Sequence, residues 1–355
     1  MAYTTIDDPS AYFTITLYTG NGNDNRAITN SANAGNFQPD WVWYKERDGT
    51  SEHRSFDSSR GNSQRLEPNN TNAEATDSTN HQSFDSNGFT IGNSGSTNEN
   101  TKTYVAWQWK ANGGTTASNS NGSITTTVQA NTTAGFSIVL YTSASGGQTI
   151  GHGLGVAPDM YWIKKRNAAG DDWFVYHSAL GEGKKQRLSG NSAAENDTNI
   201  WQNTAPTTTV ASLQNDGGGV NVSTGGTKNY IGYFFNSVQG YSKIGSYKGN
   251  GNADGTFVYT GFTPAWLLTK DTGSTEQWQI KDTTRFPKNP NYYPIFANLA
   301  NVEGNNTNSK VDFLSNGFKI RNNDGGHNTS GNEYIYMAFA EHPFVSSEGV
   351  PAPAR

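Results

Sequence analysis

The 355-residue sequence contains no cysteine, which excludes disulfide bonds and thiolate metal sites. No run approaches about 18 apolar residues, so no segment is expected to span a membrane. Residues 1–5 have neither a basic region nor an apolar core, and a signal peptide is therefore not expected. The net charge is −5 and the basic residues are dispersed, which argues against nucleic acid as a partner.

Hydrophobic residues are also scarce, at 33%, whereas aromatic residues reach 12% and glycine occurs 40 times. A chain of this composition can still build a core, because each aromatic ring buries a large area. Asn, Ser, Thr and Gly fill the spaces between short apolar runs, and no window shows a sustained helical period. Short runs between turn residues predict an all-β protein with the strand spacing of a sandwich or barrel.

The same order of four segments occurs three times along the chain. An extended aromatic run opens each copy, a proline-led aromatic strand follows, a hairpin signal with Asn-Gly comes next, and an aromatic strand closes the copy. The opening runs are residues 13–22, 136–143 and 241–251, and the proline-led strands are residues 39–45, 158–164 and 264–270. The hairpin signals are residues 84–91 and 313–320, with a looser match at 215–219 in the middle copy. The closing strands are residues 104–109, 230–235 and 334–339. This recurrence predicts three copies of one unit.

The four recurring segments divide the chain into six parts. We expect three units at residues 11–112, 133–240 and 241–343. An N-terminal arm at residues 1–10 precedes the first unit, and a linker rich in Gly, Ser, Asn and Thr at residues 113–132 separates the first unit from the second. A C-terminal tail at residues 344–355 follows the third unit. The linker has the composition of a flexible tether, although residues 123–128 are a candidate for an extra strand. Prolines predict an extended tail.

The proline-led strand of the first copy is apolar on both alternating faces. Trp41 and Trp43 lie on one face, and Val42 and Tyr44 lie on the other. A strand of this kind is covered on both sides. We therefore expect it to be central in its sheet, with the second sheet or a neighbouring chain on its outer face.

Two polar features accompany these strands. Each copy ends the strand with a lysine, and we expect the three lysines to cover apolar surface with their stems rather than to bind a ligand (Lys45, Lys164 and Lys270). Asp57 and Arg60 are spaced to pair across a turn. No nucleophile–base–acid set accompanies them.

Motifs for metals and cofactors are incomplete. Residues 250–255 resemble the start of a calcium-binding loop, but Gly261 stands where the last, glutamate ligand is needed. Residues 151–155 lack the third glycine of a dinucleotide loop and a helix to follow it. The histidines show no metal-binding spacing and are expected on the surface (His53, His81, His152, His177, His327 and His342). We therefore predict no metal-binding and no cofactor-binding residues.

Carboxylates give no catalytic pair. A glycosidase needs two carboxylates that converge in a cleft. Asp40 and Asp159 recur after the proline, but the third copy has Ala265, which favours turn residues over catalysts. Glu74 and Glu195 recur after alanine in polar loops. We predict no catalytic residue.

Several aromatic residues near loops or strand ends are candidates for a surface that faces a ligand or a partner. They are Trp109, Tyr141, Trp173, Trp201, Trp278, Tyr292 and Tyr293. Aromatic rings in polar surroundings suit sugar rings or protein partners. The same rings could belong to the core or to a subunit interface, which we weight above a sugar platform, and both alternatives remain open.

Residues 39–45, 56–61, 83–90 and 104–107, with the two ends of the chain at 4–10 and 334–344, carry a family resemblance. They resemble a domain of unknown function that recurs in structural proteins of tailed phages, marine or cyanophage-type ones especially. The resemblance covers nearly the whole chain, and the middle unit departs most from it. It implies three tandem β-sandwich units of a jelly-roll or lectin-like kind in a virion component, and it implies no catalytic residues.

We therefore expect a non-enzymatic structural protein on the exterior of a phage virion, made in the host cytoplasm. A tail fibre or tail appendage involved in host attachment is favoured. The alternatives are a head decoration or head fibre protein, a carbohydrate-binding receptor module and, third, a glycan hydrolase. The expected partners are other virion proteins, further copies of the chain in a homo-oligomer such as a trimer, and a host surface glycan, without nucleic acid or membrane insertion.

Overall fold

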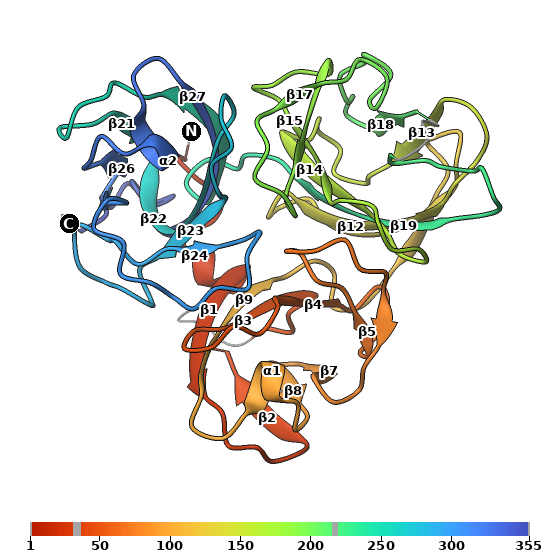
Figure 1. Cartoon of the computed structure of the whole chain (residues 1–355), viewed down its shortest axis with the longest axis horizontal. Helices are drawn as coiled ribbons and strands as arrows, with labels where there is room; N and C mark the ends of the chain where they lie inside the picture. The colour runs from red at the N-terminus through yellow and green to blue at the C-terminus, as the bar shows by residue number, and fades with distance from the viewer. Residues whose placement is uncertain (1, 31–36, 215–218, 354–355) are drawn as a thin grey trace.

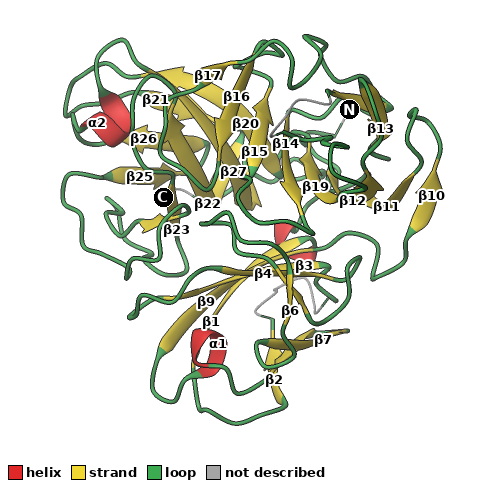
Figure 2. Cartoon of the chain, turned by 45° about the vertical axis from the view of Figure 1, so that its right-hand side comes forward, coloured by secondary structure: helices red, strands yellow, loops and turns green. Residues whose placement is uncertain are grey.

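The computed structural model describes residues 2–30, 37–214 and 219–353 and is an all-β protein of antiparallel sheets. Figure 1 shows three lobes around a common centre, one for each copy predicted from the sequence. Figure 2 shows strands connected by long loops, with the helical turns α1 and α2 (Gly95–Asn98 and Gly325–Asn328) at the periphery. No helix among the described residues has the length and apolar content needed to cross a membrane.

Unit 1, the lowest lobe in Figure 1, contains two main sheets. The larger sheet has the order β1-β9-β3-β4, from Phe13–Thr19, Thr103–Trp109, Trp41–Glu46 and Arg54–Asp57. The smaller sheet has the order β2-β8-β7, from Arg26–Thr29, Gly88–Ile91 and His81–Asp85. A short 3-10 helix η1 (Pro9–Ala11) precedes them, and a β5-β6 pair joins Gln64–Arg65 to Ala75–Thr76.

Unit 2 has the longest sheet. Its order is β10-β11-β12-β19-β14-β15-β16-β17, from Ala117–Asn119, Thr126–Asn131, Phe136–Thr142, Asn229–Phe235, Met160–Lys165, Phe174–His177, Lys184–Arg187 and Glu195–Asn196. A second sheet within the described residues pairs β13 with β18, Gln148–Gly151 with Val210–Leu213.

Unit 3 repeats the arrangement of unit 1. The larger sheet has the order β20-β27-β22-β23-β24, from Ser242–Lys248, Glu333–Pro343, Phe262–Asp271, Gln279–Asp282 and Ile295–Phe296. The smaller sheet has the order β21-β26-β25, from Phe257–Tyr259, Gly317–Ile320 and Val311–Leu314. In every unit the proline-led strand thus pairs with the closing strand, β3 with β9, β14 with β19 and β22 with β27.

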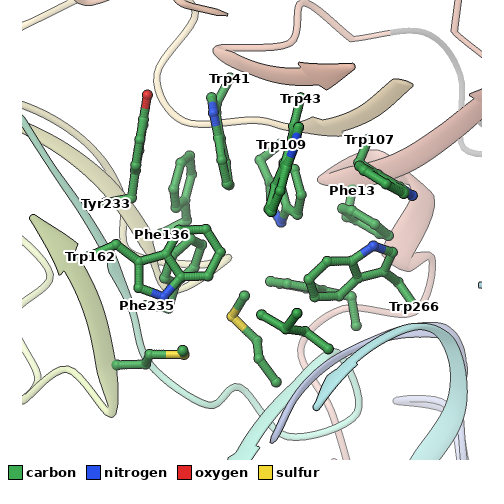
Figure 3. Close-up of a cluster of buried hydrophobic side chains, with 14 of the residues drawn as sticks. Phe13, Trp41, Trp43, Trp107, Trp109, Phe136, Trp162, Tyr233, Phe235 and Trp266 are labelled. Carbon is green, nitrogen blue, oxygen red and sulfur yellow. The ribbon is translucent and has the colours of Figure 1, made fainter. Parts of the chain in front are cut away.

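One aromatic core joins the three units (Figure 3). Trp41 stacks on Trp109 of its own unit at 4.1 Å between ring centroids and on Tyr233 of unit 2 at 4.5 Å. Phe13 of unit 1 stacks on Phe339 of unit 3 at 4.9 Å, and Phe339 contacts Phe235 of unit 2 at 6.3 Å. The larger sheets of all three units therefore share one core at the centre of the molecule.

The opposite faces of the larger sheets form three separate clusters against the smaller sheets. Because side chains alternate along a strand, Trp41 and Trp43 enter the shared core while Val42 and Tyr44 pack within unit 1. The prediction that this strand is central and covered on both faces is confirmed. The cover on one face is supplied by the other two units of the same chain.

The Asn-Gly hairpins of units 1 and 3 form as predicted, with two-residue turns between β7 and β8 and between β25 and β26. Glycine is required after the turn because the neighbouring strand approaches closely. A Cβ on Gly88 would lie 2.0 Å from the carbonyl oxygen of Ile28, and one on Gly317 would lie 2.0 Å from that of Val258.

The middle unit departs from the predicted hairpin. Its strand β18 pairs with β13 as β8 pairs with β2, and β18 ends at Leu213, before the expected turn at 215–219. The turn was therefore aligned wrongly with the hairpins of the other units. Residues 215–218 lie outside the described part of the chain.

Two segments predicted to lie outside the three units contribute to the fold. The expected tether contributes β10 and β11 to the sheet of unit 2, which confirms a strand near residues 123–128 but contradicts a flexible linker. The expected N-terminal arm places Ile6 in the shared core and lets the Thr4 hydroxyl donate to the carbonyl of Gln239 at 2.8 Å. Short polar segments of this kind are held by backbone and core contacts that their composition does not show.

Candidate functional site

The three units meet at three junctions, which we name 1–2, 2–3 and 3–1 after the units they join. At each junction, the residue just before the strand that pairs with the proline-led strand (β4, β15 or β23) bonds through a ring N–H to a backbone carbonyl of the preceding unit. Trp173 Nε1 donates to Glu67 at 3.0 Å, Trp278 Nε1 donates to Arg187 at 2.8 Å, and His53 Nε2 lies 3.1 Å from the carbonyl of Phe296. Trp43 Nε1 donates to His53 Nδ1 at 2.8 Å, which leaves Nε2 of His53 as the protonated nitrogen.

Junction 1–2 contains a buried network of charges. Asp57 accepts from Arg60 Nε at 2.5 Å and from the hydroxyl of Tyr233, in unit 2, at 2.7 Å. Arg60 also reaches Glu74 at 2.9 Å, and Glu74 is held by Arg166 of unit 2 through two bonds of 2.8 Å. Burial opposes the charge of Arg60, but Asp57, Tyr233 and Glu74 together raise its pKa. The predicted Asp57–Arg60 pair is confirmed as part of this larger network.

Junction 3–1 repeats the network with other residues. Asp282 accepts from Arg285 Nε at 2.5 Å and from Trp107 Nε1, in unit 1, at 3.1 Å. Arg285 Nη1 lies 2.9 Å from Glu303, whose second oxygen accepts from Arg47 Nε of unit 1 at 2.6 Å. Two of the three junctions thus carry an Asp–Arg–Glu–Arg chain across units.

Junction 2–3 has different residues at all of these positions. The N–H of Ala194 donates to the carbonyl of Thr272 at 2.8 Å. The N–H of Glu74 donates to the carbonyl of Arg166, and that of Glu303 to the carbonyl of Arg47, both at 2.7 Å, so Ala194 and Thr272 occupy the equivalent positions of junction 2–3. The strand register places His177 where Asp57 and Asp282 lie, and Leu180 follows it three positions on. The sequence suggested that Glu195 is the counterpart of Glu74, but Ala194 occupies that position.

A groove of about 560 Å³ opens at junction 3–1. Unit 1 contributes Arg47, Asp48 and Thr103 to its lining, and unit 3 contributes Arg285, Phe286, Tyr293, Val302 and Glu303. We call it the 3–1 groove. A volume in this range is typical of small-molecule sites in proteins.

The aromatic wall of the groove comes from a loop that is longer in unit 3. In unit 3 this loop connects the paired residues Ile280 and Ile295. The equivalent loops connect Ser55 to Leu66 in unit 1 and Val175 to Gln186 in unit 2. The loop of unit 3 is therefore four residues longer. The longer loop stacks the ring of Phe286 on that of Tyr293, with centroids 4.7 Å apart. Tyr292 packs on both rings at 5.0 Å.

The charges of the groove are largely paired. Arg285 is buried and its guanidinium bonds Asp282, Glu303 and the carbonyls of Tyr293 and Ile280. Both oxygens of Glu303 are taken by the two arginines, so neither is available to a reacting sugar in a two-carboxylate mechanism. Asp48 is exposed, and one of its oxygens accepts from the backbone N–H of Thr103 at 3.0 Å.

The seven aromatic residues named as candidates to face a ligand or partner divide into a buried and a half-buried group. Trp109, Trp173, Trp201 and Trp278 are at most 1% exposed, so they follow the core alternative, which was weighted above a sugar platform, and do not face a ligand at the surface. Each packs or bonds inside the chain because the junctions and the inter-sheet clusters cover the strand ends. Tyr292 and Tyr293 are half-buried, and Tyr293 lines the 3–1 groove. Tyr141, also considered, is buried between Tyr230 and the carbonyl of Val220.

The three recurring lysines are buried rather than spread over the surface. Lys45 Nζ donates to the carbonyls of Glu46 and Gly49 at 2.6 and 3.0 Å, Lys164 Nζ donates to that of Asp171 at 2.5 Å, and Lys270 Nζ bonds those of Asp271 and Ser274. Burial lowers the pKa of each lysine to about 8. These residues hold the loop after the strand, so the expected stem-on-surface arrangement is wrong.

The expectation of surface histidines is wrong for all but one residue. The buried ones are His53, His81, His152, His177 and His327, and His342 is exposed. Burial lowers the pKa of His53 and of His81 to about 3 and that of His177 to about 4. In unit 3, His327 Nε2 lies 2.6 to 2.8 Å from Gln279, Lys281 and Ser309, all enclosed between the sheets.

Other sequence candidates form structural contacts. Asp40 is buried and accepts from Ser58 and from the backbone N–H groups of Ala111, Gly113 and Gly114 at 2.7 to 2.9 Å, which confirms a loop residue. Residues 250–255 form a turn closed by side-chain to backbone bonds. Among the described residues, no three His, Cys, Asp or Glu side chains are placed to hold a metal ion.

Sequence reasoning did not identify most of the groove, including Arg47, Asp48, Val302 and Glu303. These residues lie in loops of different units and carry no shared motif. The available signal was the difference in loop length between Ile280 and Ile295, because a loop that differs among repeated units is where a new site can form.

The profile of a domain of unknown function, DUF7483, matches residues 8–343, which include all three units. No curated protein matches the chain, and no solved structure matches it.

Proposed function

The chain belongs to the DUF7483 family, and we propose that it is a non-enzymatic structural protein of the exterior of a phage particle. A tail fibre or tail appendage that takes part in host attachment is the form we favour. The proposal treats each unit as a β-sandwich of jelly-roll or lectin-like kind, its larger sheet facing its smaller one.

The observation that supports this proposal best is how the three units differ. The positions that recur, such as Trp109, Phe235 and Phe339 on the closing strands, lie in the shared core. The loop that is longest in unit 3 forms the wall of the 3–1 groove. A constant scaffold that presents a variable loop is suited to holding a binding surface in place.

The three-lobed body also suits a large symmetric assembly. Oligomers are built on closed symmetry, and a body with three similar faces around one centre can occupy a threefold position as a single copy. Other virion proteins and further copies of the chain are the partners in this proposal.

Electron cryomicroscopy of purified particles tests the proposal. We expect three-lobed density on the outside of the particle, at the tail. Density on the head surface would replace the tail appendage with the head decoration alternative. Mass spectrometry that finds no trace of the chain in purified particles would refute a virion role altogether.

A carbohydrate-binding receptor module is the second candidate. The half-buried Tyr293 ring beside Asp48 and Arg47 favours it, because sugar sites combine an aromatic face with polar side chains. The two candidates are compatible if the particle recognises its host through this groove.

A further inference from the structure

We propose that the 3–1 groove binds an uncharged saccharide, which deepens and rests on the proposed role in host attachment. The groove has the volume of a small-molecule site and lies between two units that are held together by the Asp282–Arg285–Glu303–Arg47 network. Its walls are therefore preformed, which lowers the entropy lost on binding.

The apolar part of the lining fits the carbon-bound hydrogens of a sugar ring. Phe286 and Tyr292 pack against Tyr293 and fix its ring at the groove. Val302 extends the apolar wall and is 45% exposed. Rigid aromatic rings give contact area at a low cost in side-chain entropy.

The polar part of the lining fits hydroxyl groups. The bond of Arg47 to Glu303 uses Nε, and no bond from the two terminal nitrogens of Arg47 to a described residue is present. Asp48 is exposed, with one oxygen held by Thr103. A hydroxyl both donates and accepts hydrogen bonds, so it can satisfy an arginine and a carboxylate side by side.

The charge balance excludes an anionic ligand from this proposal. Arg285 is fully engaged by Asp282 and Glu303, and Arg47 is paired with Glu303. An acidic sugar or a phosphate would meet Asp48 and Glu303 with one partly neutralised arginine to offset them. A peptide is also disfavoured, because β9, which supplies Thr103, lies between β1 and β3 and offers no free strand edge.

The experiment uses the full chain on an array of neutral and uronic-acid oligosaccharides, followed by titration calorimetry with the best neutral oligosaccharide. We expect neutral oligosaccharides to bind and Tyr293→Ala and Asp48→Ala each to weaken binding about tenfold or more. Tyr259→Ala, which removes an exposed tyrosine on β21 away from the groove, is the matched control and should leave affinity unchanged.

Three results would overturn the inference. They are an array on which no oligosaccharide binds, a preference for the acidic oligosaccharides, and binding that survives both groove substitutions. Circular dichroism of each variant shows that it is folded, and Asp48 is exposed, so its loss is not expected to unfold the chain. A chain found on the particle but silent on the array refutes only the saccharide; a chain that binds sugar but is absent from particles refutes only the virion role.

Discussion

Asp57 is a single residue on which two units depend. Its buried carboxylate accepts from Arg60 of its own unit and from Tyr233 of the next. We expect Asp57→Ala to lower the free energy of unfolding by about 3–5 kcal/mol, because it removes the nearer of the two carboxylates that pair with the buried Arg60 guanidinium.

Urea denaturation of the two proteins measures this loss. Asp254→Ala is the matched control, since Asp254 pairs with Lys319 at the surface and its removal should barely move the midpoint. Equal midpoints for Asp57→Ala and the unchanged protein would contradict the structural role given to the network.

Buried histidines predict a loss of stability in mild acid. The folded-state pKa is about 3 for His53 and for His81 and about 4 for His177, against an ordinary value of 6.5. Between the folded-state pKa and 6.5, the unfolded chain binds more protons than the folded chain does. The free energy of unfolding that these neutral histidines support is therefore complete above pH 6.5 and falls as the pH drops below it. Each histidine contributes a slope of about 1.4 kcal/mol per pH unit.

Denaturation curves at pH 7, 6 and 5 measure the slope before the carboxylates, whose ordinary pKa values are lower, begin to protonate. His342→Gln, at an exposed position, should leave the slope unchanged. A flat profile between pH 7 and pH 5 would show that the buried histidines take up protons without unfolding.

Single residues were predicted unevenly from the sequence. The aromatic strand residues were identified because their type and alternation specify burial, as with Trp41 and Tyr44. The recurrence of Lys45 was visible, but its burial was not, because its partners are backbone carbonyls, which any residue type can supply. Tyr293 was identified as a surface aromatic, whereas Asp48 gave no local signal.

At the scale of elements, the residues at equivalent positions of the three junctions change together from one junction to another. Junctions 1–2 and 3–1 carry Asp, Arg, Glu and Arg, while junction 2–3 carries His177, Leu180, Ala194 and Thr272. The closing strands follow the same division, since Tyr233 and Trp107 donate to the carboxylates and Met337 occupies their register position on β27.

We therefore expect His177→Asp alone to destabilise the chain by about 3 kcal/mol, because it buries a carboxylate opposite Leu180 and Met337. The fourfold variant His177→Asp, Leu180→Arg, Ala194→Glu, Thr272→Arg should recover part of that loss. Thermal denaturation of the two variants decides the matter. A fourfold variant that is less stable than the single one would show that the sets are not interchangeable between junctions.

The sequence predicted which strands recur but not every boundary. The landmarks located β3, β9 and their counterparts, because their aromatic and proline pattern is strong. The tether was misjudged because β10 and β11 are short polar strands whose order comes from pairing with β12, a tertiary contact. The middle hairpin was misjudged because a glycine-rich stretch indicates a turn without saying which strands it joins.

At the scale of the whole molecule, the shared core makes the three units depend on one another. Trp41, Phe136, Trp266 and their neighbours belong to one cluster drawn from every unit. We expect a single unfolding transition, with a calorimetric enthalpy equal to the van't Hoff enthalpy. Trp41→Ala should lower the stability of that one transition by about 3–5 kcal/mol. Separate transitions for the three units in a calorimetric scan would contradict a common core.

The number of units was predictable and their arrangement was not. Four recurring segments gave the count of three directly. The outer face of the Trp41 strand required a cover, but a single sequence cannot distinguish a neighbouring chain from another copy in the same chain. The prediction of a homo-oligomer therefore stays a prediction, since this face is already covered within the chain.

All nine tryptophans are at most 1% exposed, and most of them crowd the centre where the units meet. The indoles of Trp41 and Trp109 stack at 4.1 Å with an angle of 24° between their planes. Rings so close absorb light as a coupled pair, so the folded chain should give a strong near-ultraviolet dichroic signal and blue-shifted emission. Trp41 also contacts Trp162 of unit 2, and Trp109 contacts Trp266 of unit 3, each at 5.8 Å between ring centroids. Separation of either unit from unit 1 should therefore change these signals without an added label.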